Sequence, residues 1–381
     1  MKNFVCVLLT ALLVLLAACP ALAEEAGAFD YDAQLDALGK DELMQQVPED
    51  ARELMEETGV YDLSVGNLLG LSPRGFFGTL WRMFVEQLRL PLTVLSTVLG
   101  IIVLCALFGG MQTVAAQSSL SPLVSTVTAL CILTAISAPI LDCIVDTARA
   151  IQQASTFMLT FIPVFAAAMT AAGQAVSGLT YNAFLFATCQ IVAQVVSRTL
   201  IPLMGIYLAL CITGSVVPEL NIRSATAAIK SVVGWALGFI LTVFVGMLSV
   251  QTMVAGSADS VGTRTAKFLI GSFVPVVGGA LSDAYSAAQG CLRLIKTSVG
   301  AYGILVAALT FLPILLQVVC WYLITNLGTI AGDILGVGKV SDILKSCSSV
   351  LAILLAVIFC YMLLIIVSTT IVMVVGLGGG G

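Results

Sequence analysis

The sequence predicts an all-α protein of the polytopic membrane class, and three observations lead to this prediction. The 381 residues have a mean hydropathy of +1.09, with 59% hydrophobic and only 10% charged residues, which is more apolar surface than a water-soluble core can hold. The apolar residues form runs long enough to cross a bilayer as helices, which takes about 20 residues. Segments of the apolar body also recur in pairs, so we expect an internal duplication.

Residues 1–23 have the pattern of a cleaved signal peptide. Lys2 precedes an apolar run, and Ala21 and Ala23 frame a small-residue cleavage site. The residues before Cys19 also have the shape of a lipoprotein cleavage site, with Cys19 as the acylated residue, and this alternative stays open. Either cleavage would leave the following segment outside the cytoplasm.

The segment 24–71 is expected to form a small, acidic, extracytoplasmic head of short helices. Residues 24–89 hold 14 acidic and 5 basic side chains, whereas the chain from residue 90 onward holds 7 acidic and 10 basic ones. Pro48 is typical of a helix start and Gly59 of a helix end. The acidic balance predicts a solvated or protein-binding module and argues against nucleic acid as a partner.

Residues 72–90 are predicted to form an amphipathic helix at the membrane interface. Phe77, Trp81 and Phe84 belong to an apolar stripe on one face, and arginines occupy the other face. The alternative is that this stripe packs against the head.

The remaining chain is divided into spans and two similar halves. Phe161 and Pro163 match Phe273 and Pro275 at an offset of 112 residues, and further matches keep nearly this offset. Chance matches within an Ala-, Val-, Gly- and Leu-rich chain are the alternative. The expected segments are two transmembrane helices in 91–150, repeat 1 in 151–251, a connector in 252–266, repeat 2 in 267–375 and a flexible Gly-rich end in 376–381.

Each half contains a short segment broken by proline, a long apolar stretch and then a polar amphipathic link. The links carry basic residues, which the positive-inside rule places in the cytoplasm. Two links on the same side would make the repeats parallel. The basic residues of the links are Arg223 and Lys230 in the first half, and Lys339 and Lys345 in the second.

Polar and small residues at the broken segments are the candidate functional site. We expect these residues to line a translocation path or, alternatively, to allow close helix packing. They are Pro163, Ala167, Pro275, Gly278, Gly279 and Asp283. Arg293 and Lys296 are possible charge partners of Asp283, which alternatively ends its segment at the water surface. Asp259, in the connector, is expected to be solvated.

Catalytic and metal chemistry are not expected in this chain. It has no histidine, and its eleven cysteines include no CxxC pair, so we expect no metal site and read the cysteines as packing residues. We find no nucleotide-binding loop and no nucleophile constellation, so we expect neither enzymatic activity nor a cofactor.

Several segments carry a family resemblance, mainly between residues 205 and 315. They are 214–221 (GSVVPELN), 229–230, 244–246, Asp259, 267–268, 273–278 (FVPVVG), 282–283, 294–296, 299–300 and 312–313. With these segments the chain resembles the stage III sporulation protein AE family over nearly its whole length. The head is only generally similar, and the Gly-rich end is shorter and more degenerate than in that family.

The resemblance implies a multi-pass protein of the mother-cell membrane around the forespore, with its head facing the intermembrane space. It implies a place in the channel complex that links the two cells and is needed for late forespore gene expression. The implied partners are other membrane proteins of that complex, including ring-forming proteins, a cytoplasmic ATPase and the forespore protein called stage II sporulation protein Q, together with membrane lipid.

Two functions follow as hypotheses. In the first, the broken segments line a path and the protein is a translocation element. In the second, the body is a scaffold that anchors ring-forming partners. A polar, water-accessible centre would favour the path and a dry, packed centre the scaffold; a solute permease unrelated to sporulation is a third reading.

Overall fold

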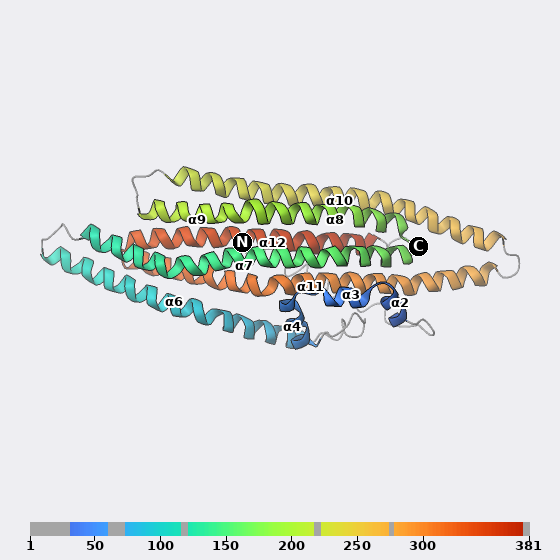
Figure 1. The fold of residues 1–381 in the computed structure, drawn as a ribbon, viewed down its shortest axis with the longest axis horizontal. Helices are drawn as coiled ribbons and strands as arrows, with labels where there is room; N and C mark the ends of the chain where they lie inside the picture. The colour runs from blue at the N-terminus through green and yellow to red at the C-terminus, as the bar shows by residue number, and fades with distance from the viewer. Residues whose placement is uncertain (1–30, 60–72, 116–120, 217–221, 274–277, 376–381) are drawn as a thin grey trace.

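The computed structural model describes residues 31–59, 73–115, 121–216, 222–273 and 278–375. Every regular element within them is helical, as predicted. The expected signal peptide and the Gly-rich end lie outside the described residues. The long helices run side by side in an elongated bundle (Figure 1), with three short head helices along one flank.

The head consists of α2 (Tyr31–Ala37), α3 (Lys40–Gln45) and α4 (Glu49–Thr58). The helix α4 begins after Pro48 and ends at Gly59, whose φ of +79° is the left-handed conformation that glycine adopts at little cost. The apolar side chains of the head are buried: Leu35, Leu43, Val47, Ala51, Leu54 and Met55. They belong to the same core as the long helices, so the head is packed onto the body.

The body is formed by long helices, and successive helices run in opposite directions except for α8 and α9, which continue in the same direction. They are α6 (Pro73–Ala115), α7 (Ser121–Ala171), α8 (Ala175–Val195), α9 (Ile201–Val216), α10 (Arg223–Phe273), α11 (Gly278–Ile334) and α12 (Gly338–Val375). A π-helical turn, η1 (Val196–Leu200), joins α8 to α9 in one rod. Among the described residues, six segments are long and apolar enough to cross a membrane.

Proline does not break these helices where the sequence suggested. The helix α6 continues through Pro91, so the expected interfacial helix and the first expected span form one helix. The helix α7 continues through Pro163. The helix α11 likewise continues through Pro313. Long apolar helices tolerate proline because neighbouring groups satisfy the freed carbonyls. Among the prolines inside the described helices, Pro202 is the one with a local change, the π turn just before it. Proline cannot donate to the carbonyl four residues earlier.

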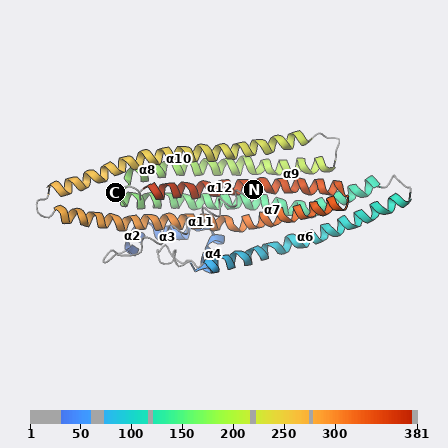
Figure 2. The ribbon, with the colours of Figure 1, turned by 180° about the vertical axis from the view of Figure 1, so that it is seen from behind.

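The expected connector at residues 252–266 is not a separate element. It lies inside α10, which is one helix from Arg223 to Phe273. The start of α10 and the start of α12, which follow the two expected polar links, lie at the same end of the bundle in both views (Figures 1 and 2). Such an arrangement is the one that parallel repeats would have, although the duplication itself stays a prediction.

The centre of the bundle is filled by aromatic rings of α7. Phe157, Phe161 and Phe165 are stacked in sequence, with ring centroids 5.7 and 5.5 Å apart. Gly303 of α11 lies directly against Phe161, where a Cβ carbon on the glycine would come within 2.1 Å of the ring. Glycine at this position therefore allows α11 to approach α7 closely.

Candidate functional site

Five polar side chains gather where the turn between α7 and α8 meets α10 and α11, near the end of α12. We call them the polar cluster: Gln174, Asp259, Gln289, Arg293 and Lys296. Four of the five are buried, with Lys296 only 2% exposed. Buried ionisable groups in apolar helices are costly, so the contacts that retain them indicate what the cluster does.

Asp259 of α10 caps the beginning of α8. Its Oδ1 accepts a hydrogen bond from the Val176 backbone N–H at 2.9 Å, and its Oδ2 accepts one from Ser177 at 2.8 Å. The first N–H groups of a helix have no partner within the helix, and the side chain of Gln174, which precedes α8, makes no capping bond. A carboxylate also suits the positive end of the helix dipole. Asp259 thus fastens α10 to the start of α8.

Lys296 of α11 fastens the end of α12. Its Nζ donates to the backbone oxygens of Val372 at 3.0 Å and Met373 at 3.2 Å, and to Oε1 of Gln174 at 2.8 Å. The three bonds match the three N–H groups of an ammonium. Two acceptors are carbonyls in the last turn of α12, the negative end of its dipole. One buried side chain therefore joins α11, α12 and the α7–α8 turn.

The turn between α7 and α8 needs glycine. Gly173 has a φ of +81°, and the next N–H, of Gln174, donates to Met169 O at 2.9 Å, which closes the last turn of α7. A Cβ carbon on Gly173 would come 2.5 Å from Nε2 of Gln289 on α11. The turn is therefore seated against α11 as well.

Arg293 lies one turn before Lys296 on α11 and is half-buried. Its Nε is buried and has no hydrogen-bond partner within the described part of the chain. With Asp259 as its carboxylate, the polar cluster holds one more cation than anion. Its described hydrogen bonds go mainly to helix ends, an arrangement that can hold three helix termini at one level.

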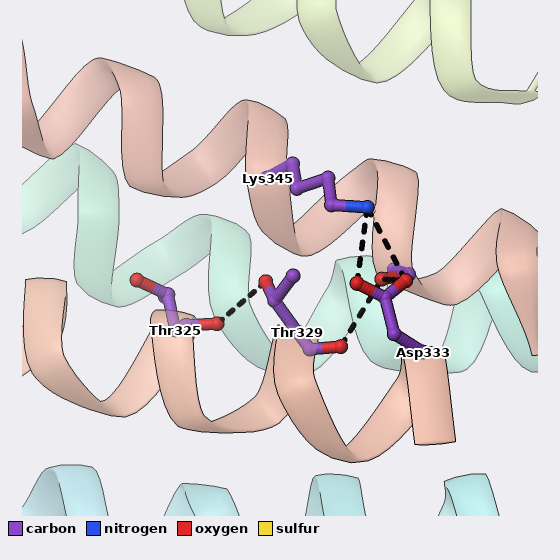
Figure 3. Close-up of polar contacts among 5 residues, drawn as sticks. Thr325, Thr329, Asp333 and Lys345 are labelled. Carbon is purple, nitrogen blue, oxygen red and sulfur yellow. Dashed lines mark hydrogen bonds and ion pairs between the residues drawn. The ribbon is translucent and has the colours of Figure 1, made fainter. Parts of the chain in front are cut away.

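A second group of polar side chains lies at the opposite end of the bundle, at the α11–α12 turn (Figure 3). Lys345 forms an ion pair with Asp333 at 3.2 Å, and Ser341 donates a short hydrogen bond to the same carboxylate. Thr329 O accepts a second bond from Ser341 at 3.1 Å. The ion pair is about half exposed, and its contacts join only the two helices of one hairpin.

The two predicted path residues on α7 do not face the centre of the bundle. Pro163 and Ala167 are exposed on α7, whereas Ala166 and Ala168 are buried. Gly278 and Gly279 open α11. Pro275 lies outside the described residues. At the level of Pro163 the interior is occupied by the ring stack of α7 and by Tyr181 of α8, whose ring meets Phe165 edge-on at 5.1 Å.

The suggested pairing of Asp283 with Arg293 or Lys296 is wrong. All three residues lie on the continuous helix α11, where separations of 10 and 13 residues correspond to about 15 and 20 Å along the axis. The expectation that Asp259 is solvated is also wrong, since it is 9% exposed. Of the cluster, the sequence therefore identified Arg293 and Lys296 as notable but not their contacts.

Three cluster residues were missed or misread for a common reason. Gln174 and Gln289 are neutral, and Asp259 accepts hydrogen bonds from a helix start 82 and 83 residues earlier in the chain. A local capping motif could not reveal this pairing.

The expected interfacial residues lie on the first part of α6. Phe77 is 64% and Trp81 69% exposed, while Phe84 is half-buried and has its ring 6.0 Å from that of Trp81. Arg82, on the other face, forms an ion pair with Glu57 of the head. The two outward rings suit an interface, a role that stays a prediction.

Comparison with known proteins gives a consistent family assignment. The sequence model of the family described as Stage III sporulation protein AE (spore_III_AE) matches residues 57–376. The chain is also similar to "Stage III sporulation protein AE" of Bacillus subtilis (strain 168), with 24% identity over 233 residues. That alignment covers 61% of this chain and 58% of the relative, less than two thirds of its length. No solved structure matches the chain.

Proposed function

Because this chain belongs to the stage III sporulation protein AE family, we propose that it is a membrane scaffold within a sporulation complex that links mother cell and forespore. Family membership makes it a membrane protein involved in sporulation. The finer role rests on how the body is packed. In this proposal the protein is not an enzyme; it holds other components in place in the mother-cell membrane around the forespore.

The observation that carries the proposal is the ring-filled centre of the bundle. Phe157, Phe161 and Phe165 are each at most 1% exposed and are stacked against one another and against glycines of α11. Protein interiors packed in this way leave little room for water. A dry centre suits a rigid support better than a conduit through one chain.

A translocation element is the second candidate, and one observation favours it in a changed form. Pro163 and Ala167 face outward from α7. Any path that they line would therefore run between this chain and a neighbour. Such a path requires assembly, so the scaffold role would come first in either case.

The acidic head is the proposed contact for ring-forming partners. On α4 the exposed charged residues are predominantly acidic: Glu49, Asp50, Glu53, Glu56 and Glu57, with Arg52 the basic member. Complementary charge guides association and orientation more than it adds affinity. We infer that the head faces the intermembrane space after signal-peptide cleavage, and that a basic surface of a partner binds it. A cytoplasmic ATPase would meet the end of the bundle at which α10 and α12 begin, where the basic links lie.

Accessibility of buried and exposed alanines tests the scaffold. Single cysteines replace Ala168 and Ala307, both 1% exposed, in a chain without its native cysteines; Ala167→Cys is the matched exposed control. A membrane-impermeant maleimide is applied in sporulating cells. We expect no labelling at the two buried positions, and labelling there above the level of Phe161→Cys would overturn the dry scaffold.

Recovery of partners tests the positive part of the proposal. The double variant Glu53→Lys and Glu56→Lys should lower the amount of complex proteins that co-purify with the chain by about tenfold, because two repulsive charges replace two attractive ones. The variant Asp36→Lys, on another head helix, is the matched control. Unchanged recovery in the double variant would rule out the acidic face of α4 as the contact.

A further inference from the structure

The outward face of α10 is apolar over about one bilayer thickness. It carries large exposed apolar side chains from Val232 to Val254, and the exposed polar residues Lys230 and Ser257 lie just outside this stretch. From Val232 to Val254 the helix rises about 33 Å at about 1.5 Å per residue, and the hydrocarbon core of a bilayer is about 30 Å thick. Lipid is therefore sufficient to cover this face, and the stretch gives the depth of the hydrocarbon on that flank.

The head lies on the opposite flank of the bundle. Its helices contact α6, α7 and α11. In both views α3 and α4 lie across the bundle from α8 and α10 (Figures 1 and 2). The head therefore covers a flank of the body that lies beside the depth at which lipid covers α10.

Contacts across the bundle give the same depth for the head. A Cβ carbon on Gly39, which precedes α3, would lie 3.6 Å from the side chain that comes just before Phe165 on α7. The ring of Phe165 meets Tyr181 of α8 at 5.1 Å, and Phe184, three residues further on α8, stacks with Phe244 of α10 at 5.5 Å. Phe244 lies near the middle of the apolar stretch of α10. Gly39 is therefore level with the middle of that stretch to within about two helical turns.

The outer surface of the head is too acidic for hydrocarbon. Its exposed acidic side chains on α3 and α4 are Asp41, Glu42, Glu49, Asp50, Glu53, Glu56 and Glu57. Ionised side chains are costly in hydrocarbon and normally face protein or water. An average helix tilt of about 20° shifts the two flanks in depth by only about 10 Å across three helix widths. Lipid on α10 and the acidic head on the opposite flank therefore exclude each other.

We propose that the head is a detachable cover of the α7–α11 flank. It packs there as long as lipid does not surround this depth of the body, and it moves to the membrane surface when lipid does. The helix α4 suits that surface, since Ala51, Leu54 and Met55 form a buried apolar face opposite its acidic residues. The flank then contacts lipid, and the acidic side chains face water. This release does not depend on a scaffold role of the body.

Disulfide formation between the head and the flank tests the release. In a cysteine-free, full-length chain in phosphatidylcholine nanodiscs, Gly39→Cys is combined with Val164→Cys, the contact described above. The control pair is Gly332→Cys with Ser341→Cys, whose Cβ carbons would lie 3.5 Å apart within the body, a distance that a disulfide can bridge. After mild oxidation, the remaining thiols are counted with a maleimide that adds mass. We expect at least about fivefold less disulfide in the head pair than in the control pair, because the charged head avoids hydrocarbon. Equal amounts would overturn the proposal.

Neutralising the head tests whether charge causes the release. Asp41→Asn, Glu42→Gln, Glu53→Gln and Glu56→Gln are combined with the head cysteine pair. Without these charges the head should return to the flank, so the amount of disulfide should rise at least about threefold. This rise would also show that the two cysteines can reach each other. A disulfide yield that stays low in the neutral head would overturn the proposal.

Cysteine labelling in the same nanodiscs tests the depth of the bilayer. Val243→Cys lies at the middle of the outward face of α10, where the valine is 48% exposed, and lipid should protect it from a charged, water-soluble maleimide. Asp41→Cys on the head should be labelled. Labelling of Val243→Cys as fast as Asp41→Cys would mean that the bilayer lies elsewhere, and protection of Asp41→Cys would mean that the head stays in hydrocarbon. Either result would overturn the proposal.

Discussion

The turns at Gly173 and Gly336 have the same backbone but very different surroundings. In both, glycine has a positive φ, +81° and +72°, and the residue that follows donates its N–H five residues back, to Met169 O and to Gly332 O, each at 2.9 Å. At Gly173 the nearby polar side chains are buried and come from several helices. At Gly336 the charged side chains Asp333 and Lys345 form an ion pair that is about half exposed, and buried Ser341 bonds to the same carboxylate within the hairpin. The turn motif is therefore the same, and burial decides how much of the fold depends on it.

The largest effect is expected for Lys296→Met. The change removes the donor for Gln174 Oε1 and for two carbonyls of α12, while it relieves the desolvation of a buried ammonium. We expect a net loss of about 2–4 kcal/mol, because unsatisfied buried acceptors cost about 1–3 kcal/mol each. Thermal unfolding of the purified protein in detergent measures it.

The control for this variant is Leu292→Met, one turn earlier on α11. If Lys296→Met unfolded at the same temperature as that control, the hydrogen bonds of Lys296 would add no measurable stability to the buried end of the bundle. The comparison between the two turns would then fail.

Asp259→Asn is expected to have the next largest effect, about 1–2 kcal/mol. The amide can accept only one of the two N–H bonds that start α8, and it loses the charge that suits the helix dipole. Unfolding in a denaturant series measures the loss, and Ser257→Ala on the exposed face of α10 is the control. Exchange of the Val176 and Ser177 amide hydrogens should accelerate as well, which a general loss of stability elsewhere would not single out.

Alanine at the two turn glycines separates backbone strain from crowding. Gly336→Ala should cost about 1–2 kcal/mol, the usual cost of a left-handed conformation for a residue with a Cβ, since no atom lies within 4 Å of that carbon. Gly173→Ala should cost more, because the same strain is joined by the contact with Gln289. Equal melting temperatures for both variants would show that Gln289 yields without loss.

The smallest effect is expected for Asp333→Asn at the exposed end. The carboxylate pairs with Lys345 in a solvent-screened position, and such pairs contribute little. The melting temperature should change far less than in Lys296→Met, and the small change should shrink further at high salt. A loss as large as that of Lys296→Met would mean that both ends are equally important.

Composition and apolar runs were sufficient to predict the helical membrane body, because they reflect the solvent in which the helices lie. The helix boundaries were harder to predict, since proline was read as a break. The structure continues through Pro163 and Pro313 and turns instead at Gly173 and Gly336. With 34 glycines in the chain, nothing local distinguishes these two from glycines inside helices.

The site was only partly predictable. Arg293 and Lys296 stood out as charges in an apolar region, but Lys296 binds carbonyls 76 and 77 residues away. Backbone acceptors carry no sequence signature, so a search for a carboxylate partner selected Asp283 instead. Asp259 was read as solvated for the same reason, because its partners are backbone N–H groups.

The π turn at Val196–Leu200 has a consequence for how the chain can vary in length. A π turn holds one residue more than an α turn of the same rise, so it acts as an inserted residue absorbed within a continuous rod. Deleting one residue there would convert the turn to regular α-helix and leave the faces of α8 and α9 in their present orientation. Deleting one elsewhere in the rod would rotate one part by about 100° relative to the other. Relatives of different length are thus expected to gain or lose their residue at this turn.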